Sequence, residues 1–388
     1  MTDLMPPTAG GIAPIDKPAD KPRRPHFSSG PTAKPPGWRL EALRTDIMGR
    51  NIRSPEVLAR FREARDLTRR VLRIPEDYTL VFTPASDTGA VEAALWNLLG
   101  ARPVQVLAYE NFGKTWAADV RDHLKLAPEV LEVDFGALPD LSRVRPDCDL
   151  VFAWNGTTSG VRVPDAGFIA AGRDGLTICD ATSAAFAMPL EWDKLDTTTF
   201  SFQKALGGDA GIGVLVLSPR AVERLDSHAP AWPVPKVLRL RDAHGFDRQL
   251  AEAVPINTYS ILALEDWMAC LAWAEAVGGL PALVARTQAN FRVLADWVER
   301  TPWIDFLARD PATRSETSVC LRFTEDRAQA DGFARGVAAW LKDKGAALDV
   351  ESHRAAPPGL RIWCGATVET EDVRALLPWL DLAYAEAL

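Results

Sequence analysis

The chain has 388 residues, 47% of them hydrophobic and 25% charged, which suits a globular protein with two domains and excludes a fibrous or disordered chain. Its net charge of -8 and pI near 5.3 argue against a general attraction to nucleic acid or anionic membranes, so an acidic ligand would need dedicated arginines. Because no apolar run approaches the length of a membrane span and the N-terminus lacks the apolar core of a secretory signal, we expect a cytoplasmic protein.

The cysteines are odd in number, widely spaced and free of CxxC pairs. Most of them stand in apolar runs, which favours reduced core residues over disulfides or a zinc site. We therefore expect no metal centre. The cysteines are Cys148, Cys179, Cys270, Cys320 and Cys364.

The first residues show no apolar period. Residues 1–25 are rich in Pro, Gly, Ala and charge, which predicts a disordered leader. The turn-rich segment FSSGPTAKPPGW follows, and we expect it to pack over the body of the protein. Ser54 and Pro55 then supply an N-cap and a first-turn proline for an amphipathic helix that should run to about Leu72.

From residue 79 to about residue 218, short apolar runs alternate with helical segments. Near-continuous apolar runs bounded by turn residues are typical of buried strands in a mostly parallel sheet, with helices on both faces. We predict one large α/β domain over residues 26–260. Its expected strands are TLVFTPA, VQVLAY, VLEVDFG, CDLVFAWN, LTICDA, TTTFSF and GVLVLS.

The remainder of the chain, residues 261–388, predicts a smaller α+β domain. A long helical region begins after Ser260, and a further helix covers about residues 283–300. The runs SVCLRF and LRIWCGA read as strands, with helices near residues 333–344 and at the C-terminus.

An acid and a lysine stand at the ends of two successive predicted strands. Asp180 ends GLTICD and Lys204 ends TTTFSFQK, so the two could face one another across neighbouring strand ends. This arrangement suits pyridoxal 5'-phosphate, because the acid keeps its ring nitrogen protonated and the lysine bonds to its aldehyde. Taken singly, Asp180 is more readily explained as a helix cap and Lys204 as a solvated loop residue than as catalytic groups.

The segment TPASDTG links the first predicted strand to a helix. Free backbone N–H groups and the helix dipole make such a helix start an anion site, and Ser86 and Thr88 could add hydroxyl donors. Since a carboxylate repels phosphate, we expect the Asp87 side chain to turn away or to cap the helix. A plain helix cap remains an equal interpretation of this segment alone.

Two further loops follow strand ends. AYENFGKT resembles a nucleotide-binding P-loop, but Tyr109, Glu110 and Phe112 would crowd the phosphates, so we reject that interpretation. Phe112 can instead stack on a flat ring, with Trp116 one turn farther on. The hydroxyls of WNGTTSG could bond to a ring substituent, although a polar turn explains them as well.

Three arginines lie in loops or at a strand start, away from helix surfaces. Arg53, Arg354 and Arg361 carry planar guanidinium groups suited to carboxylate and phosphate. They can share a site only if the N-terminal loop and the C-terminal domain meet over the edge of the sheet.

Several motifs together resemble the phosphoserine aminotransferase family, whose members are class V, fold-type I transferases dependent on pyridoxal phosphate. The resemblance covers the chain from about Phe27 to its C-terminus. It rests on FSSGPTAKPPGW, PASDTGAVEAALW, WNGTTSGVRVP, ICDATSAAFA, TFSFQKALGG, INTYS and GLRIWCGATVE.

The resemblance implies a role for each matching position around the cofactor. Lys204 would carry the cofactor and Asp180 would pair with its ring nitrogen. The aromatic stacked on the ring would be Phe112, with Thr157 and Gln203 near the ring hydroxyl. The phosphate cup would contain Ser86, Asp87 and Thr88, assisted by Thr182 and Ser183, and the positions by which a partner subunit completes it are Asn257 and Thr258. A homodimer is therefore implied.

The family's substrate residues match Arg53, His353, Arg354 and Arg361, which would hold the carboxylate and phosphate of the amino acid. The implied reaction converts O-phosphoserine and 2-oxoglutarate to 3-phosphohydroxypyruvate and glutamate in serine biosynthesis, with 4-phosphohydroxythreonine of vitamin B6 synthesis as a further substrate. This chain has Ile52 where the family usually has histidine, and a proline-rich loop before Arg361.

Three alternatives stay open. The substrate could be another small acidic or neutral amino acid. A desulfurase or lyase of the same fold would need an exposed cysteine nucleophile. A non-catalytic α/β binding protein would keep the fold without the cofactor.

Overall fold

The computed structural model describes residues 16–325 and 331–387, so residues 1–15 of the expected leader lie outside it. The rest of that leader lies against the C-terminal part of the chain. The backbone N–H of Arg23 donates to the Asp372 carboxylate at 2.7 Å, and the Lys21 ammonium bonds to the carbonyl of Lys344.

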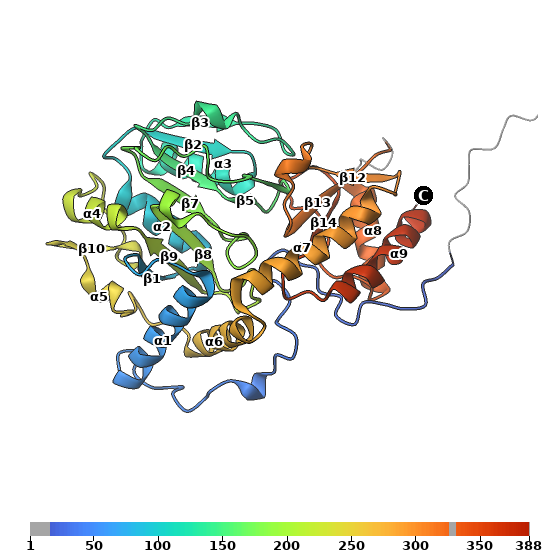
Figure 1. Ribbon diagram of the computed structural model, residues 1–388, viewed down its shortest axis with the longest axis horizontal. Helices are drawn as coiled ribbons and strands as arrows, with labels where there is room; N and C mark the ends of the chain where they lie inside the picture. Colours follow the sequence, from blue (N-terminus) through green and yellow to red (C-terminus); the bar gives the residue numbers. More distant parts are fainter. Residues whose placement is uncertain (1–15, 326–330, 388) are drawn as a thin grey trace, which may run out of the picture.

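A seven-stranded sheet forms the centre of the larger lobe (Figure 1). The strand order is β1-β9-β8-β7-β4-β2-β3, and all neighbours from β3 to β8 are parallel, whereas β9 runs antiparallel to both β1 and β8. The prediction of a mostly parallel sheet is confirmed. The strands are β1 (Thr79–Pro84), β2 (Val104–Ala108), β3 (Glu129–Glu132), β4 (Asp149–Ala153), β7 (Thr177–Asp180), β8 (Thr197–Ser201) and β9 (Ile212–Leu217).

Helices cover both faces of this sheet. Alternate strand residues point to opposite sides, so Val81 and Leu215 belong to one hydrophobic cluster and Leu80 and Val214 to another. The first cluster contains residues of α2 (Ser86–Leu98), α3 (Asn111–Ala118) and α4 (Pro219–Ser227). The second contains residues of α1 (Pro55–Leu72) and α6 (Ile261–Ala276), which pack against each other.

The predicted cap of α1 is confirmed. The Ser54 side chain accepts a hydrogen bond from the Val57 backbone N–H, and Pro55 opens the helix. Shorter elements complete the larger lobe: β5 (Asn155–Gly156), β6 (Val161–Arg162), β10 (Arg241–Asp242), β11 (Gly245–Phe246) and α5 (Arg248–Ala251).

The C-terminal lobe is built on an antiparallel sheet of three strands in the order β12-β13-β14 (Figure 1). They are β12 (Ile304–Phe306), β13 (Ser318–Phe323) and β14 (Leu360–Trp363). Its helices are α7 (Gly279–Val298), α8 (Asp331–Asp343) and α9 (Thr370–Ala387), and α9 packs on both others. Since α6 packs on α1 of the larger lobe, the domain division after residue 260 stays a prediction.

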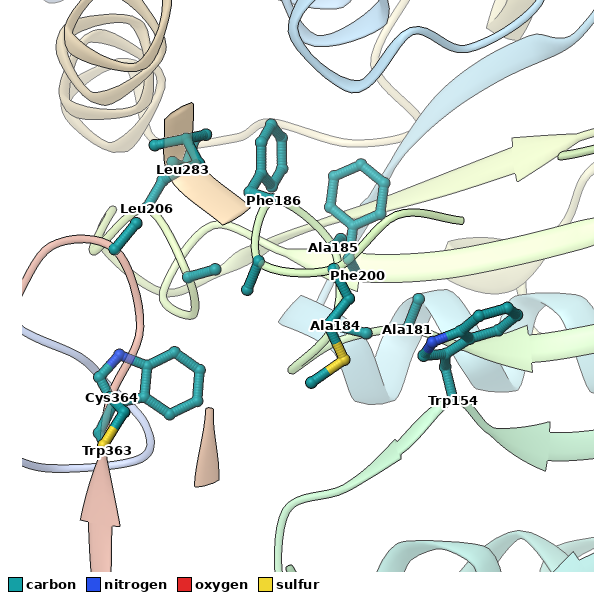
Figure 2. Close-up of a cluster of buried hydrophobic side chains, with 14 of the residues drawn as sticks. Trp154, Ala181, Ala184, Ala185, Phe186, Phe200, Leu206, Leu283, Trp363 and Cys364 are labelled. Atoms are coloured by element: carbon teal, nitrogen blue, oxygen red, sulfur yellow. The ribbon is translucent and has the colours of Figure 1, made fainter. Parts of the chain in front are cut away.

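A buried apolar cluster lies where the two lobes meet. Figure 2 shows Ala184, Phe186 and Leu206 of the larger lobe in one cluster with Leu283 and Trp363 of the C-terminal part. Ala184 and Phe186 lie in the segment after β7, and Leu206 lies in the segment after β8. Burial of these residues at the junction holds the carboxyl ends of the two strands beside the smaller lobe.

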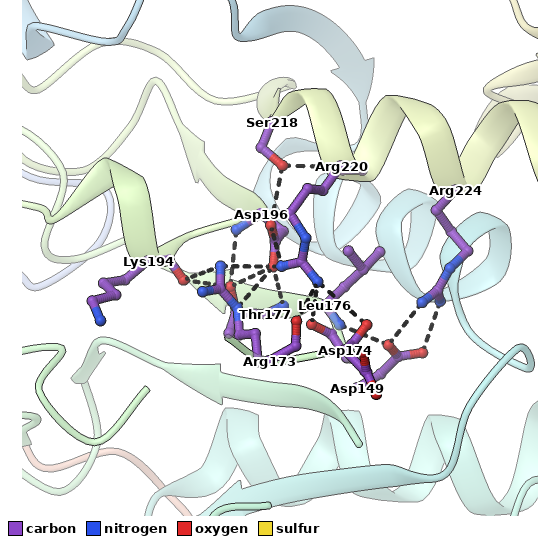
Figure 3. Close-up of polar contacts among 12 residues, drawn as sticks. Asp149, Arg173, Asp174, Leu176, Thr177, Lys194, Asp196, Ser218, Arg220 and Arg224 are labelled. Carbon is purple, nitrogen blue, oxygen red and sulfur yellow. Dashed lines mark hydrogen bonds and ion pairs between the residues drawn. The ribbon is translucent and has the colours of Figure 1, made fainter. Parts of the chain in front are cut away.

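The opposite ends of the strands are fixed by ion pairs. Asp196, just before β8, accepts from Arg173 and Arg220, and Asp149, at the start of β4, pairs with Arg224 (Figure 3). Both carboxylates are almost completely buried and fully paired, so this network is structural.

Across the described ranges, no single helix has the length and apolar composition needed to cross a membrane. Only α6 and α7 taken together meet that test, and they are bent by 86° where they join.

Candidate active site

Asp180 and Lys204 stand at the carboxyl ends of neighbouring parallel strands. Asp180 is the last residue of β7, where it pairs in register with Thr199 of β8, and Lys204 follows the end of β8. The carboxyl ends of parallel strands are where α/β folds bind ligands. The sequence-predicted acid and lysine therefore meet at one edge of the sheet.

The Asp180 carboxylate accepts hydrogen bonds from Thr182 and Trp116. The backbone N–H of Thr182 donates to Oδ1 at 3.0 Å, and the indole N–H of Trp116 donates to Oδ2 at 3.2 Å. Burial raises the pKa of Asp180, and the nearby carboxylate of Asp87 raises it further. The two donors act in the opposite direction.

The Lys204 ammonium contacts the N-terminal segment. Its Nζ donates to the carbonyl oxygen of Ser29 at 2.8 Å. Burial lowers the pKa of Lys204, the Asp87 carboxylate opposes that effect, and the Arg361 guanidinium adds to it. An amine with a lowered pKa more readily reaches the neutral form that is nucleophilic and basic.

Gly30 makes this close approach possible. Its φ is +155°, and a Cβ atom there would come within 2.9 Å of Lys204 Cε and closer still to Nζ. The next turn of the segment is tied down as well, because the Thr32 N–H donates to the Gln203 carbonyl at 3.0 Å. The expected packing of FSSGPTAKPPGW over the body thus occurs directly over Lys204.

The start of α3 carries the predicted stacking aromatic. Phe112 lies 6.0 Å from the His353 ring and 6.5 Å from the Trp116 ring, measured between ring centroids. Glu110 caps the helix by accepting from the Gly113 N–H at 2.6 Å, and it also accepts from Thr158 Oγ1 at 2.9 Å. The carboxylate of Glu110 therefore joins the Phe112 helix to the Thr157–Thr158 turn.

Helix α2 begins where the sequence predicts an anion site. Gly89 allows its first turn to lie against β1, because a Cβ at this position would collide with the carbonyl oxygen of Pro84. The Asp87 carboxylate accepts from the side chains of Ser86, Ser201 and Gln203 rather than from a backbone N–H of the helix. Three donors hold it there, while the exposed Thr88 stays at the helix start. The expected turn of the Asp87 side chain away from a bound phosphate stays a prediction.

The hydroxyl residues form a buried chain between the lobes. Thr157 Oγ1 donates to Ser183 Oγ at 2.8 Å, and the Asn155 amide bonds both to Ser183 Oγ and to Thr317 Oγ1 of the smaller lobe. Thr157 and Ser183 therefore lie in direct hydrogen-bond contact.

Several buried polar atoms around Lys204 have no hydrogen-bond partner among the described residues. They are Ser29 Oγ, Gln203 Oε1 and Arg361 Nε. Buried polar atoms are rarely left unpaired, so these positions indicate a polar ligand. A flat pyridine ring with a phosphate and a hydroxyl supplies such partners, and the residues present fit pyridoxal 5'-phosphate together with an acidic substrate.

Arg361 has the environment of an anion-binding residue. It lies on β14, and no carboxylate among the described residues pairs with its guanidinium. Burial lowers its pKa, as expected for an uncompensated cation. Arg361, His353 and the exposed Arg354 line one cavity of about 420 Å³.

Arg53 lies elsewhere on the molecule. Its Nη2 donates to the Pro255 carbonyl at 3.3 Å, and both residues line a second cavity of about 630 Å³ that Arg361 does not reach. Asn257 and Thr258 directly follow this cavity's lining residues Pro255 and Ile256. Arg53 therefore lines a different cavity from Arg361 and His353. Ile52 is 7% exposed and belongs to the hydrophobic core.

The five cysteines are all free and all buried. Burial raises the thiol pKa of Cys179, Cys320 and Cys364, which disfavours the thiolate form. None of the five is an exposed nucleophile. The described residues contain no group of three or more metal-ligating side chains.

Sequence reasoning did not single out Ser29, Gly30, Glu110, Asn155 or Thr317. The one sequence signal among these residues was the position of Glu110, which follows a predicted strand end and stands two residues before Phe112. The others act through the carbonyl of Ser29, the missing side chain of Gly30, or hydrogen bonds between lobes.

Comparisons with known proteins show the family and the fold. A family model described as aminotransferase class-V matches residues 49–334. The chain is 48% identical over 369 residues to the phosphoserine aminotransferase of Methanosarcina barkeri, covering 95% of this chain and 99% of that protein.

Solved structures share the fold. A phosphoserine aminotransferase from Cytophaga hutchinsonii superimposes with a TM-score of 0.79 at 20% identity, covering 92% of this chain and 98% of that one. A PLP-bound phosphoserine aminotransferase from Trichomonas vaginalis gives a TM-score of 0.73 at 19% identity, covering 92% and 100%.

Proposed function

The chain belongs to the class-V aminotransferase family, whose members depend on pyridoxal 5'-phosphate, and from that premise we propose that it transfers the amino group of O-phosphoserine to 2-oxoglutarate. The products are 3-phosphohydroxypyruvate and glutamate. The observation that carries the proposal is the placement of Asp180 and Lys204 at adjacent strand ends, beside the unpaired guanidinium of Arg361. The 48% identity to the M. barkeri enzyme supports the choice of phosphoserine.

Cofactor binding follows from the residues around these strand ends. Lys204 would bond to the cofactor's aldehyde, Asp180 would accept a hydrogen bond from its protonated ring nitrogen, and Phe112 would stack on the ring. The start of α2, with Ser86, Asp87 and Thr88, receives the phosphate, assisted by Thr182 and Ser183, while Thr157 and Gln203 serve the ring hydroxyl. When bound, the cofactor supplies an electron-accepting ring that stabilises negative charge at the substrate's Cα.

Lys204 is the proton carrier. Its amine has a lowered pKa, so it would take the proton from Cα of the bound amino acid and return a proton on the cofactor side of the transferred nitrogen. Asp180 keeps the ring nitrogen protonated throughout. Because the reaction with 2-oxoglutarate runs through the same steps in reverse, Lys204 serves both halves.

Substrate recognition uses the three arginines and His353. Arg361 has no carboxylate partner in the described chain and holds the α-carboxylate through two parallel hydrogen bonds. His353 and Arg354 line the same cavity and face the substrate's phosphate. O-phosphoserine and 4-phosphohydroxythreonine carry the same amine, carboxylate and phosphate, so we propose that both are accepted.

A second copy of the chain completes the site. Arg53 lines the 630 Å³ cavity with Pro255 and Ile256, and Asn257 and Thr258 are the next two residues of the chain. In a homodimer they reach the neighbouring site, where Asn257 and Thr258 complete the phosphate cup and Arg53 supplies a further cation. Asn257 Oδ1 is buried without a partner, which supports a ligand or partner contact there.

Replacement of Lys204 tests the assignment. Lys204→Ala should abolish turnover of phosphoserine and the yellow absorbance of lysine-bound cofactor, while the folded structure persists. Retained turnover would refute the role of Lys204.

The shared site is tested by mixing two inactive variants. When Arg53→Ala and Lys204→Ala subunits form a mixed dimer, one of its two sites is intact, so about half of the wild-type activity per mixed dimer should return. No recovery in proven mixed dimers would place Arg53 in the same chain's site.

A further inference from the structure

The indole of Trp116 makes a buried contact with Asp180. Trp116 lies on α3, is 2% exposed, and donates from Nε1 to Asp180 Oδ2 at 3.2 Å. This hydrogen bond joins two segments that are 64 residues apart in the chain. It lies outside the set of residues assigned above to cofactor or substrate.

The surrounding contacts fix the Trp116 indole in its hydrogen bond to the Asp180 carboxylate. Trp116 stacks beside Phe112 on the same helix at an interplanar angle of 28°, and the capping contact of Glu110 fixes the start of that helix. Thr182 N–H holds the other carboxylate oxygen. Asp180 therefore stays in one orientation, between a donor from α3 and a donor from its own turn.

Two features of the surroundings favour a protonated Asp180, and the hydrogen bonds from Thr182 and Trp116 oppose them. Burial penalises its negative charge, and the Asp87 carboxylate repels it. A neutral Asp180 could not keep the ring nitrogen protonated, because it has no charge to stabilise the pyridinium. A donor to the carboxylate counters both effects, since it bonds more strongly to the charged form. The other ionisable groups around it are Tyr109, Glu110, Cys179 and Lys204.

We propose that Trp116 is a positioning residue that keeps Asp180 ionised and oriented, and so keeps the proton on the ring nitrogen of the bound cofactor. The proposal rests on the cofactor assignment made above and deepens it. Trp116 acts entirely through Asp180.

The test compares cofactor affinity across pH in Trp116→Phe and wild type. Without the donor, Asp180 is protonated at higher pH, so the acid-side loss of pyridoxal phosphate affinity should move up by about one pH unit. Binding is followed in the holoenzyme by cofactor absorbance and equilibrium dialysis, and does not require turnover.

A matched control exists in the smaller lobe. The indole of Trp297, which is 6% exposed, donates to the Asp381 carboxylate at 3.3 Å. Trp297→Phe removes the same kind of hydrogen bond far along the chain, and its pH profile should match that of wild type. An equal shift in both variants would overturn the proposal.

A double variant separates positioning from general packing. In Asp180→Asn the ionisable partner is gone, so adding Trp116→Phe should leave cofactor affinity unchanged within about twofold. A further loss of tenfold or more would show that Trp116 acts through packing and would overturn the proposal.

A second substitution covers the case in which Trp116→Phe does not fold. Site-specific 3-benzothienylalanine keeps the indole shape and replaces the N–H by sulfur. The same upward shift in the pH at which cofactor affinity is lost supports the proposal, and an unchanged pH overturns it. If the wild type itself bound no pyridoxal phosphate, the proposed function would be refuted together with this inference. If a variant binds the cofactor and loses affinity at the same acid pH as the wild type, only this inference is contradicted.

Discussion

Lys204 Nζ donates a hydrogen bond at 2.8 Å to the backbone carbonyl of Ser29, a residue 175 positions earlier in the chain. The N-terminal segment therefore forms part of the wall around Lys204. Because the acceptor is a backbone atom, substitution of the Ser29 side chain would leave the contact in place. Substitution of the neighbouring Gly30 is therefore the better test.

Gly30→Ala should impair cofactor attachment. The added methyl group would overlap the end of the Lys204 side chain and displace it, so we expect cofactor affinity on the order of tenfold weaker. The measurement is the absorbance of lysine-bound cofactor against added pyridoxal phosphate. Gly37→Ala is the control, because Gly37 also has a positive φ, +78°, but nothing lies within 4 Å of a Cβ there. Equal losses in both variants would attribute the effect to backbone strain.

Arg361→Gln should weaken substrate binding without lowering the stability of the folded protein. Loss of the bidentate carboxylate contact should raise KM for both the amino acid and the oxo acid on the order of a hundredfold. The free energy of unfolding should not fall, since the guanidinium has no carboxylate partner among the described residues.

The contrasting variant is Arg224→Gln, whose partner Asp149 is completely buried. Removing one member of a buried pair costs about 3 kcal/mol or more, so this variant should unfold more easily with KM nearly unchanged. Denaturant unfolding and steady-state kinetics on both variants check the prediction. A destabilised Arg361→Gln enzyme with normal KM would contradict it.

Glu110 should make stability depend on pH. Burial raises the pKa of Glu110 from 4.5 to about 7. Because the folded state keeps this proton to higher pH than the unfolded state does, the associated stability is present below pH 4.5 and is lost as pH rises through about 7. Over that window the wild type should lose about 3 kcal/mol relative to Glu110→Gln.

The comparison uses denaturant unfolding at pH 4.5 and pH 8. Glu371→Gln serves as the control, because this side chain is 78% exposed. A pH-independent difference between wild type and Glu110→Gln would refute the buried-carboxylate account.

Most of the fold could be predicted from the sequence because its elements are locally marked. Each of the seven apolar runs became a strand of the large sheet, and Ser54 with Pro55 marked the start of α1. The strand β12 was missed because Ile304–Phe306 is too short for a periodic pattern, and its pairing with β13 is a tertiary contact.

The site was predictable where side chains follow strand ends. Asp180 and Lys204 meet because β7 and β8 are adjacent, which the order of the runs suggested. The direction of Asp87 was not predictable, since its partner Gln203 lies 116 residues farther along the chain. Sequence spacing also could not separate Arg53 from Arg361, because only the fold shows that they line different cavities.

The most direct test of the account is a panel of amino donors with 2-oxoglutarate on the purified protein. We predict that kcat/KM for O-phosphoserine exceeds that for serine, alanine and aspartate, because, of these four, only phosphoserine carries the phosphate that engages the His353–Arg354 side of the cavity while Arg361 holds the carboxylate. The panel includes 4-phosphohydroxythreonine, which should also be accepted. A higher kcat/KM for serine, alanine or aspartate than for O-phosphoserine would contradict the account.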